Sequence, residues 1–153
     1  MRQLLAGLAR SLNGFTTAMT IMTRLDFASD RFLPYLPEAC QVNPGAYGFE
    51  LALWLSNALM QAGIATGYPM SEDWGWFIEY VEGEAEFMIG CGCAADEGDG
   101  YRGQPLRWSV FVRQVLSLRQ RWRGQATPAL AAKLTRAIVA VLEADGITVR
   151  VEE

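Results

Sequence analysis

An alternating pattern of apolar and polar residues between residues 74 and 91 constrains the fold of this chain more than any other feature. In its first half, every second residue is large and apolar: Trp74, Trp76, Ile78 and Tyr80. Gly75, Phe77, Glu79 and Val81 would then occupy the opposite face, since side chains alternate between the two faces of a β-strand. Residues 82–85 suit a tight turn, and Phe87, Ile89 and Cys91 share one face of a second strand. The sequence therefore predicts an antiparallel β-hairpin.

A helix is predicted before the hairpin, over residues 44–62. Asn43 is a suitable N-cap and Pro44 suits the first helical position, where a missing N–H costs little. Gly63 would end the helix in the left-handed conformation. One helical stripe is apolar and is expected to face the core: Leu51, Leu55, Ala58, Leu59 and Ala62.

A second helix follows Thr127 and Pro128 and ends before Asp145-Gly146. Strands are predicted at residues 107–114 and 147–152, where apolar residues again alternate with polar ones. The fold class is therefore α+β: a mainly antiparallel sheet of about four strands, with two main helices packed on one face and a short N-terminal helix. The 153 residues, 51% of them hydrophobic, suffice for one core.

We divide the chain into an N-terminal extension, residues 1–25, and a single α+β domain, residues 26–153. The extension carries apolar residues at helical spacing, which predict a short helix: Leu4, Leu5, Leu8, Leu12 and Phe15. Translation from Met22 would remove most of this extension. Residues 94–105, rich in glycine and acidic residues, are predicted to form a mobile loop.

The charged residues are grouped in two blocks. Residues 72–99 contain nine acids and no base, and residues 102–123 contain six arginines and no acid. The blocks could neutralise each other across the sheet or present two surface patches of opposite sign. A net charge of −4 and a pI near 4.9 argue against a nucleic-acid partner and favour a basic protein partner.

No apolar run is long enough to span a bilayer, so no membrane association is predicted. Three cysteines are too few for a disulfide framework, which suits a reducing, cytoplasmic setting. A homodimer is also compatible with the sequence.

The absence of histidine excludes the usual Ser-His and Cys-His pairs of nucleophilic enzymes. The acids Glu72 and Asp73 stand beside Trp74 and Trp76, and a carboxylate desolvated by indole rings could act as a general acid. The same residues could form a binding surface, with Tyr80 as a further aromatic anchor. In the third interpretation Asp73 caps a turn, Glu72 is solvated and both indoles belong to the core.

Cys91 and Cys93 lie two residues apart, so in a strand both thiols would point the same way. Shared metal ligation, redox chemistry and simple core packing all remain open. A structural zinc site takes four ligands, so the third cysteine and a carboxylate would have to join. No cofactor is predicted.

The segment from Asn43-Pro44 through Glu72-Asp73-Trp74-Gly75-Trp76 resembles a group of small uncharacterised bacterial proteins that share this pattern. The resemblance covers about half of the chain and implies neither an activity nor site residues.

From the sequence we expect a small, acidic bacterial protein that acts as a non-enzymatic protein-binding module, in the manner of an immunity protein or a chaperone. Its binding residues would be Glu72, Asp73, Trp74, Trp76 and Tyr80. The alternatives are a histidine-independent enzyme that uses the carboxylates near Trp74 and Trp76, and a metal site at Cys91 and Cys93.

Overall fold

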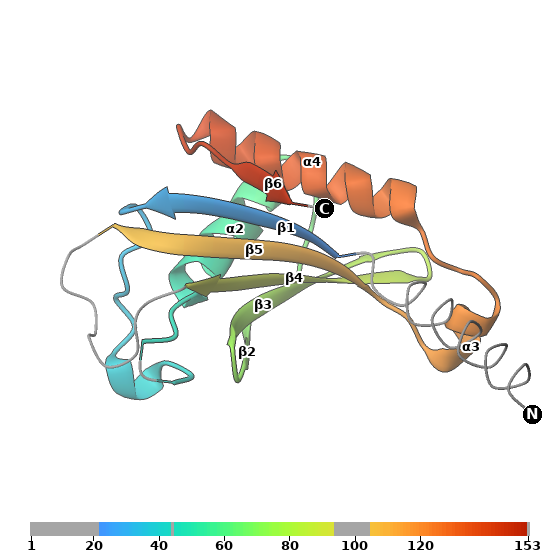
Figure 1. The fold of residues 1–153 in the computed structure, drawn as a ribbon, viewed down its shortest axis with the longest axis horizontal. Coiled ribbons are helices and arrows are strands. Elements are labelled where there is room, and N and C mark those ends of the chain that lie inside the picture. The colour runs from blue at the N-terminus through green and yellow to red at the C-terminus, as the bar shows by residue number, and fades with distance from the viewer. Residues whose placement is uncertain (1–21, 44, 94–104, 153) are drawn as a thin grey trace, which may run out of the picture.

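Six strands form one antiparallel sheet in the order β2-β3-β4-β5-β1-β6 (Figure 1). The computed structural model describes residues 22–43, 45–93 and 105–152. Its strands are β1 (Met22–Ser29), β2 (Met70–Glu72), β3 (Gly75–Glu82), β4 (Ala85–Cys93), β5 (Leu106–Val115) and β6 (Arg150–Glu152). The predicted α+β class and antiparallel sheet are confirmed.

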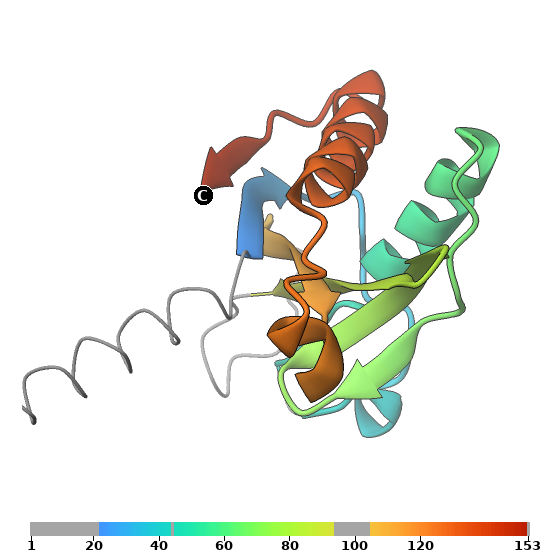
Figure 2. The ribbon, with the colours of Figure 1, turned by 90° about the vertical axis from the view of Figure 1, so that its right-hand side faces the viewer.

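The main helices, α2 (Phe49–Gln61) and α4 (Pro128–Ala144), lie on one face of this sheet (Figure 2). The short α3 (Leu118–Trp122) lies on the opposite side of the sheet from α4, near the end of β5 (Figures 1 and 2). A 3-10 turn, η1 (Glu38–Cys40), precedes α2. We call the side under α2 and α4 the covered face and the other side the open face.

The prediction of about four strands was wrong, because β1 and β2 were not recognised. β2 has only three residues, too few for an alternating pattern, and all three are exposed. In β1 only Leu25 and Phe27 enter the core, between polar neighbours. β1 nevertheless pairs with β5 along its whole length. The domain boundary that we placed after residue 25 falls inside this strand, so residues 22–25 belong to the sheet.

The core lies between the covered face and the two helices. Of the predicted stripe on α2, the leucines Leu51, Leu55 and Leu59 are completely buried, whereas Ala62 at the end of the helix is exposed. On α4 the most buried residues are Leu134, Ile138 and Leu142, and on β5 they are Trp108, Val110 and Val112. Each such side chain stabilises the fold by about 1.5–3 kcal/mol relative to its exposed state.

The predicted hairpin is confirmed. β3 pairs with β4 from Trp76–Cys91 to Glu82–Ala85, and a two-residue turn joins them at Gly83-Glu84. Gly83 has a φ of +63°, a conformation that glycine adopts at little cost. The predicted closing strand is shorter than expected, because only Arg150–Glu152 pair with β1.

The predicted start of the first helix was wrong. α2 begins at Phe49, with Gly48 at the N-cap position. The Asn43 side chain donates a hydrogen bond to the Asp73 carbonyl at 2.5 Å. Pro44 lies outside the described residues. The Gly48 backbone packs so closely on β4 that an added Cβ would lie 2.4 Å from the Cys91 carbonyl oxygen. The helix therefore starts where its backbone meets the sheet, not at the local capping signal.

Both helix ends were predicted correctly. After α2, Gly63 has a φ of +86°, and the Ile64 N–H donates to the Leu59 carbonyl. After α4, Gly146 has a φ of +81°, and the Ile147 N–H donates to the Leu142 carbonyl. At the start of α4, Pro128 is the first residue, but the Thr127 side chain makes no capping hydrogen bond.

The predicted helix in residues 1–21 and most of the predicted loop at 94–105 lie outside the described residues. Within the part of the chain that the structure describes, no helix has the length and apolar character needed to cross a membrane.

Candidate functional site

An aromatic strip runs across the middle of the open face, over β3, β4 and β5. It consists of Trp74, Phe77, Met88 and Phe111, grouped around Gly90. Phe77 pairs with Gly90, which in turn pairs with Phe111. The Phe111 ring occupies the space above Gly90, since an added Cβ there would lie 2.2 Å from two ring carbons. Glycine in β4 therefore lets aromatic rings from the neighbouring strands come together.

Trp74 completes this strip from the turn between β2 and β3. Its ring centroid lies 4.9 Å from that of Phe111, a distance typical of favourable aromatic pairs. Trp74 remains 43% exposed, and Met70 of β2, opposite Phe77, is 39% exposed. Such a group of exposed apolar side chains marks an interaction surface more often than a scattered single one.

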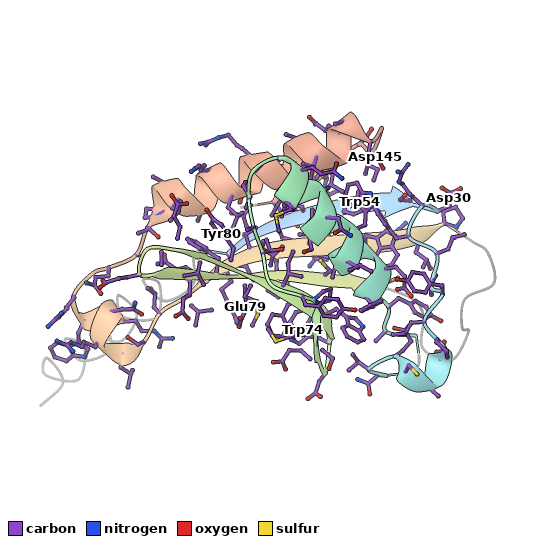
Figure 3. All side chains as sticks on the ribbon, turned by 180° about the vertical axis from the view of Figure 1, so that it is seen from behind. Asp30, Trp54, Trp74, Glu79, Tyr80 and Asp145 are labelled. Carbon is purple, nitrogen blue, oxygen red and sulfur yellow. The ribbon has the colours of Figure 1, made fainter. Side chains whose placement is uncertain are left out.

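The charged residues that β2, β3 and β4 carry on the open face are all acids. Glu72 of β2, Glu79 of β3 and Glu86 of β4 form this acidic half, and all three are exposed. Figure 3 shows Glu79 and Trp74 on the side of the strands away from α4. Three acids of the acidic block thus lie together on one half of the sheet.

The strands on the other side form a basic half, made of Arg107 and Arg113 of β5, Arg24 of β1 and Arg150 of β6. Within it, Arg24 pairs with Asp26 at 2.9 Å, and Arg150 pairs with Glu152. The pair with Glu152 raises the pKa of Arg150, chiefly through the hydrogen bond. Arg113 donates to the Met88 sulfur at 3.3 Å and so reaches the aromatic strip.

The two halves do not neutralise each other through the ion pairs that the structure shows. Among the described residues, these pairs join Arg24 to Asp26, Arg31 to Asp145, Lys133 to Glu82 and Arg150 to Glu152. None of them involves Glu72, Glu79 or Glu86, nor Arg107 or Arg113. A cavity of about 450 Å³ also opens in the basic half, where Arg24, Arg107 and Arg150 contribute to its lining. The open face is therefore acidic on one side and basic on the other.

The structure separates the five binding residues that we predicted. Trp74 and Glu72 belong to the open face, and Asp73 lies between them in the turn. Trp76 and Tyr80 point to the covered face, where they pack against the core. The prediction that Trp74 and Trp76 share a face was wrong, because Trp74 lies in the turn and not in β3. Figure 3 shows Tyr80 on the same side as α2 and α4.

Trp76 and Tyr80 have contacts of their own on the covered face. The Trp76 ring lies 5.1 Å from that of Phe49 at the start of α2, and its buried Nε1 makes no hydrogen bond to any described residue. The Tyr80 hydroxyl donates a hydrogen bond to the Glu82 carboxylate at a distance of 2.6 Å. This hydrogen bond, together with partial burial, raises the pKa of Tyr80. Both residues therefore help to hold β3 in place.

The geometry does not assemble the carboxylate site considered for an enzyme. Glu72 and Asp73 are both exposed to solvent, so neither indole desolvates them. Trp76 lies on the opposite face of the sheet from Trp74. The two carboxyl groups and the two indoles therefore do not form one desolvated site.

The cysteines occupy the covered face of β4. Cys91 is completely buried, and burial raises its pKa strongly; burial also raises the pKa of Cys93 to about 11. Both groups are thus thiols at neutral pH, whereas metal binding and thiol redox chemistry use the thiolate. Within the described ranges, no group of three or more His, Cys, Asp or Glu residues is placed to hold a metal ion.

Three groups of apolar residues at or near the surface were not identified from the sequence. Phe111 was the exception to alternation in β5, and this exception was the signal for an apolar open face. On α3, Leu118 and Trp122 are four residues apart, and Trp122 is 82% exposed. A second aromatic cluster joins Tyr35 and Tyr68 to Phe49 near the start of α2. No short-range pattern links these three residues, so this cluster could not be predicted from the sequence.

Comparison with protein families, with curated proteins and with solved structures gives no match for this chain.

Proposed function

We propose that this protein is a non-enzymatic binding module for another protein, and that the open face of the sheet is its binding surface. The observation that supports this most strongly is the aromatic strip. Trp74 is held against Phe111 and yet remains 43% exposed, on a face that neither main helix covers. An exposed indole on a rigid support is typical of the few residues that dominate the energy of protein interfaces.

The charges beside the strip indicate the chemistry of the partner. Glu72, Glu79 and Glu86 would receive lysine or arginine side chains, while apolar groups of the partner cover Trp74 and Met70. Opposite charges at the rim accelerate the encounter and orient the partner, and burial of the apolar centre supplies most of the affinity. The partner is therefore a protein with a basic surface around an apolar centre, as expected for a small acidic bacterial protein of the cytoplasm.

Catalysis by the carboxylates has less support, because Glu72 and Asp73 are exposed and Trp76 lies on the other face. A cysteine metal site has less support because, among the residues that the structure describes, no group of three or more His, Cys, Asp or Glu is placed to hold a metal ion. The open face needs neither chemistry to act as a docking surface.

Affinity capture from an extract of the source cells tests the proposal. Immobilised wild-type protein, a Trp74→Ala variant and a Met60→Ala variant are compared at low and high salt. Met60 is an exposed apolar residue of α2, far from the open face, so its replacement is the matched control. We expect proteins that the wild type and Met60→Ala retain at low salt, that Trp74→Ala loses, and that high salt releases. Identical captured proteins for all three would contradict the use of the open face.

A further inference from the structure

We propose that the partner which closes the open face is a second copy of this chain, so that the protein forms a face-to-face dimer. This inference rests on the proposed function, since it uses the same surface. The proposed function requires a basic surface beside an apolar centre. The chain carries such a surface itself, on β5, β1 and β6. Because one face holds both halves, it is complementary to itself.

The strand order places the change of charge at the middle of the sheet. Three strands, β2, β3 and β4, lie on the acidic side, and three, β5, β1 and β6, lie on the basic side. The boundary between β4 and β5 runs through the aromatic strip, where Gly90 pairs with Phe111 and Met88 with Arg113. A two-fold axis along this boundary would bring apolar groups of both copies together at the centre.

The charges select the direction of the axis. Rotation about an axis parallel to the strands places the acidic half of one copy on the basic half of the other. Rotation about an axis across the strands would place like charges together, which costs several kcal/mol. A symmetric dimer made by one self-complementary patch is the commonest closed assembly of soluble proteins. Two packed sheets with nearly parallel strands are also a frequent arrangement.

The strand register shows which charges would meet. Glu72 lies opposite Gly75 at one edge, and Asp26 lies opposite Arg150 at the other, along the same row of the sheet. The axis brings Glu72 of one copy toward Arg150 of the second copy. It brings Glu79 of one copy over Met22 of the second copy's β1, where Arg113 lies beside Met22 in the same row and Arg24 lies two residues along the strand. Each of these contacts occurs twice in the dimer.

The dimensions of the sheet set an upper limit on the area that a face-to-face dimer could bury. Six strands spaced by about 4.8 Å span about 24 Å, and the ten residues of β5 extend for about 33 Å. The face thus offers at most about 800 Å² per copy, the area that each partner contributes to a typical specific interface. Trp74 and Met70 supply apolar groups, and the exposed Val81 and Val115 extend them along the strands.

Sedimentation equilibrium of the purified full chain tests the dimer. We expect a concentration-dependent dimer of the wild type that weakens as salt rises, because exposed charge contacts are screened. Glu79→Arg puts a positive charge into the acidic half, and Arg113→Glu puts a negative charge into the basic half. Each change places like charges together twice, so each should raise the dimer dissociation constant by about a hundredfold.

Mixing the two variants provides the decisive result. An equimolar mixture of Glu79→Arg and Arg113→Glu should form a heterodimer, since the two changed positions then face each other with opposite charges, and the unchanged Glu79 and Arg113 do the same at the second contact. The matched controls are Glu143→Arg and Arg136→Glu, which make the same charge changes at exposed positions on α4. They should sediment as the wild type does, and circular dichroism of all variants should show the same folded spectrum.

Three results would overturn the dimer: a wild type that is monomeric at every concentration at low salt, controls that weaken the dimer as much as the open-face variants, or a mixture that stays monomeric. A monomeric wild type whose capture of other proteins still depends on Trp74 would leave the proposed function intact. A dimer that captures no other protein would support self-association and contradict a role with a different partner.

Discussion

The covered and open faces of the sheet are built from the same strands and differ in how far their apolar residues are buried. On the covered face, Ile78, Ile89 and Val110 are completely buried by helices. On the open face, Trp74 and Val81 keep 43% and 59% of their surface exposed. The comparison teaches that alternation in a strand decides which residues share a face, whereas the packing of helices decides which face becomes the core.

The charged residues of the long strands reinforce this contrast. The open face carries Glu79, Glu86, Arg107 and Arg113. The residues of the same strands that point to the covered face are almost entirely apolar. The covered face can therefore serve stability alone. The binding that we propose uses the open face, where the exposed Trp74 lies beside charged side chains.

The largest expected effect comes from a large residue of the covered face. Phe87 is 1% exposed, and Phe87→Ala would leave a cavity under the helices. We expect the free energy of unfolding to fall by about 3–5 kcal/mol, as measured by urea denaturation. A loss below about 1 kcal/mol would show that this face is not the core.

A smaller effect is expected from Gly90→Ala on the open face. The new methyl group would displace the Phe111 ring, and we expect a loss of about 1–3 kcal/mol in the free energy of unfolding. Gly67→Ala is the matched control, since an added Cβ there has only ordinary contacts at 3.8 Å or more. In a Phe111→Val background the cost of Gly90→Ala should be much smaller. An equal cost in both backgrounds would contradict the contact between Gly90 and Phe111.

The covered face should also show in the pH dependence of stability. Burial raises the pKa of Cys93 from the usual 9.0 to about 11, so the folded state holds the proton more tightly than the unfolded state. This contribution is complete below pH 9 and is lost as the pH rises toward 11. We expect Cys93→Ser to reduce the decrease in the free energy of unfolding over that range, measured by denaturation at several pH values. An unchanged decrease would place the Cys93 thiol in solvent.

The smallest effect on stability is expected from Trp74→Ala. The indole rests on one ring and is largely exposed, so its removal should lower the free energy of unfolding by less than about 1 kcal/mol. The same variant should nevertheless abolish association, which would separate the two faces by function. A loss of stability as large as that of Phe87→Ala would show that Trp74 is a core residue.

The elements with regular patterns could be predicted from the sequence. The hairpin of β3 and β4 and the apolar stripes of α2 and α4 follow local periodicity, which burial on the covered face preserves. β1 was missed because Arg24 and Asp26 interrupt a short apolar pattern. The start of α2 was misplaced because Asn43 bonds to Asp73, thirty residues away, and local rules do not register such a contact.

The candidate site was only partly predictable for a related reason. Glu72 and Trp74 were identified. The alternation of β3 does not continue through the turn, however, so Trp76 was wrongly placed on the same face as Trp74. Phe111 comes from a strand thirty-seven residues away in sequence and meets Trp74 only because β4 carries Gly90 between them. The division into acidic and basic halves depends on the order of strands in the sheet, which no single segment encodes.

Hydroxyl-radical footprinting at low and high protein concentration tests most directly whether the open face is the surface of association. Oxidation of Trp74, Met70 and Met88 should fall as the concentration rises, while that of Met60 on α2 stays constant. Equal oxidation of Trp74 at both concentrations, or protection of Met60 in its place, would contradict the account.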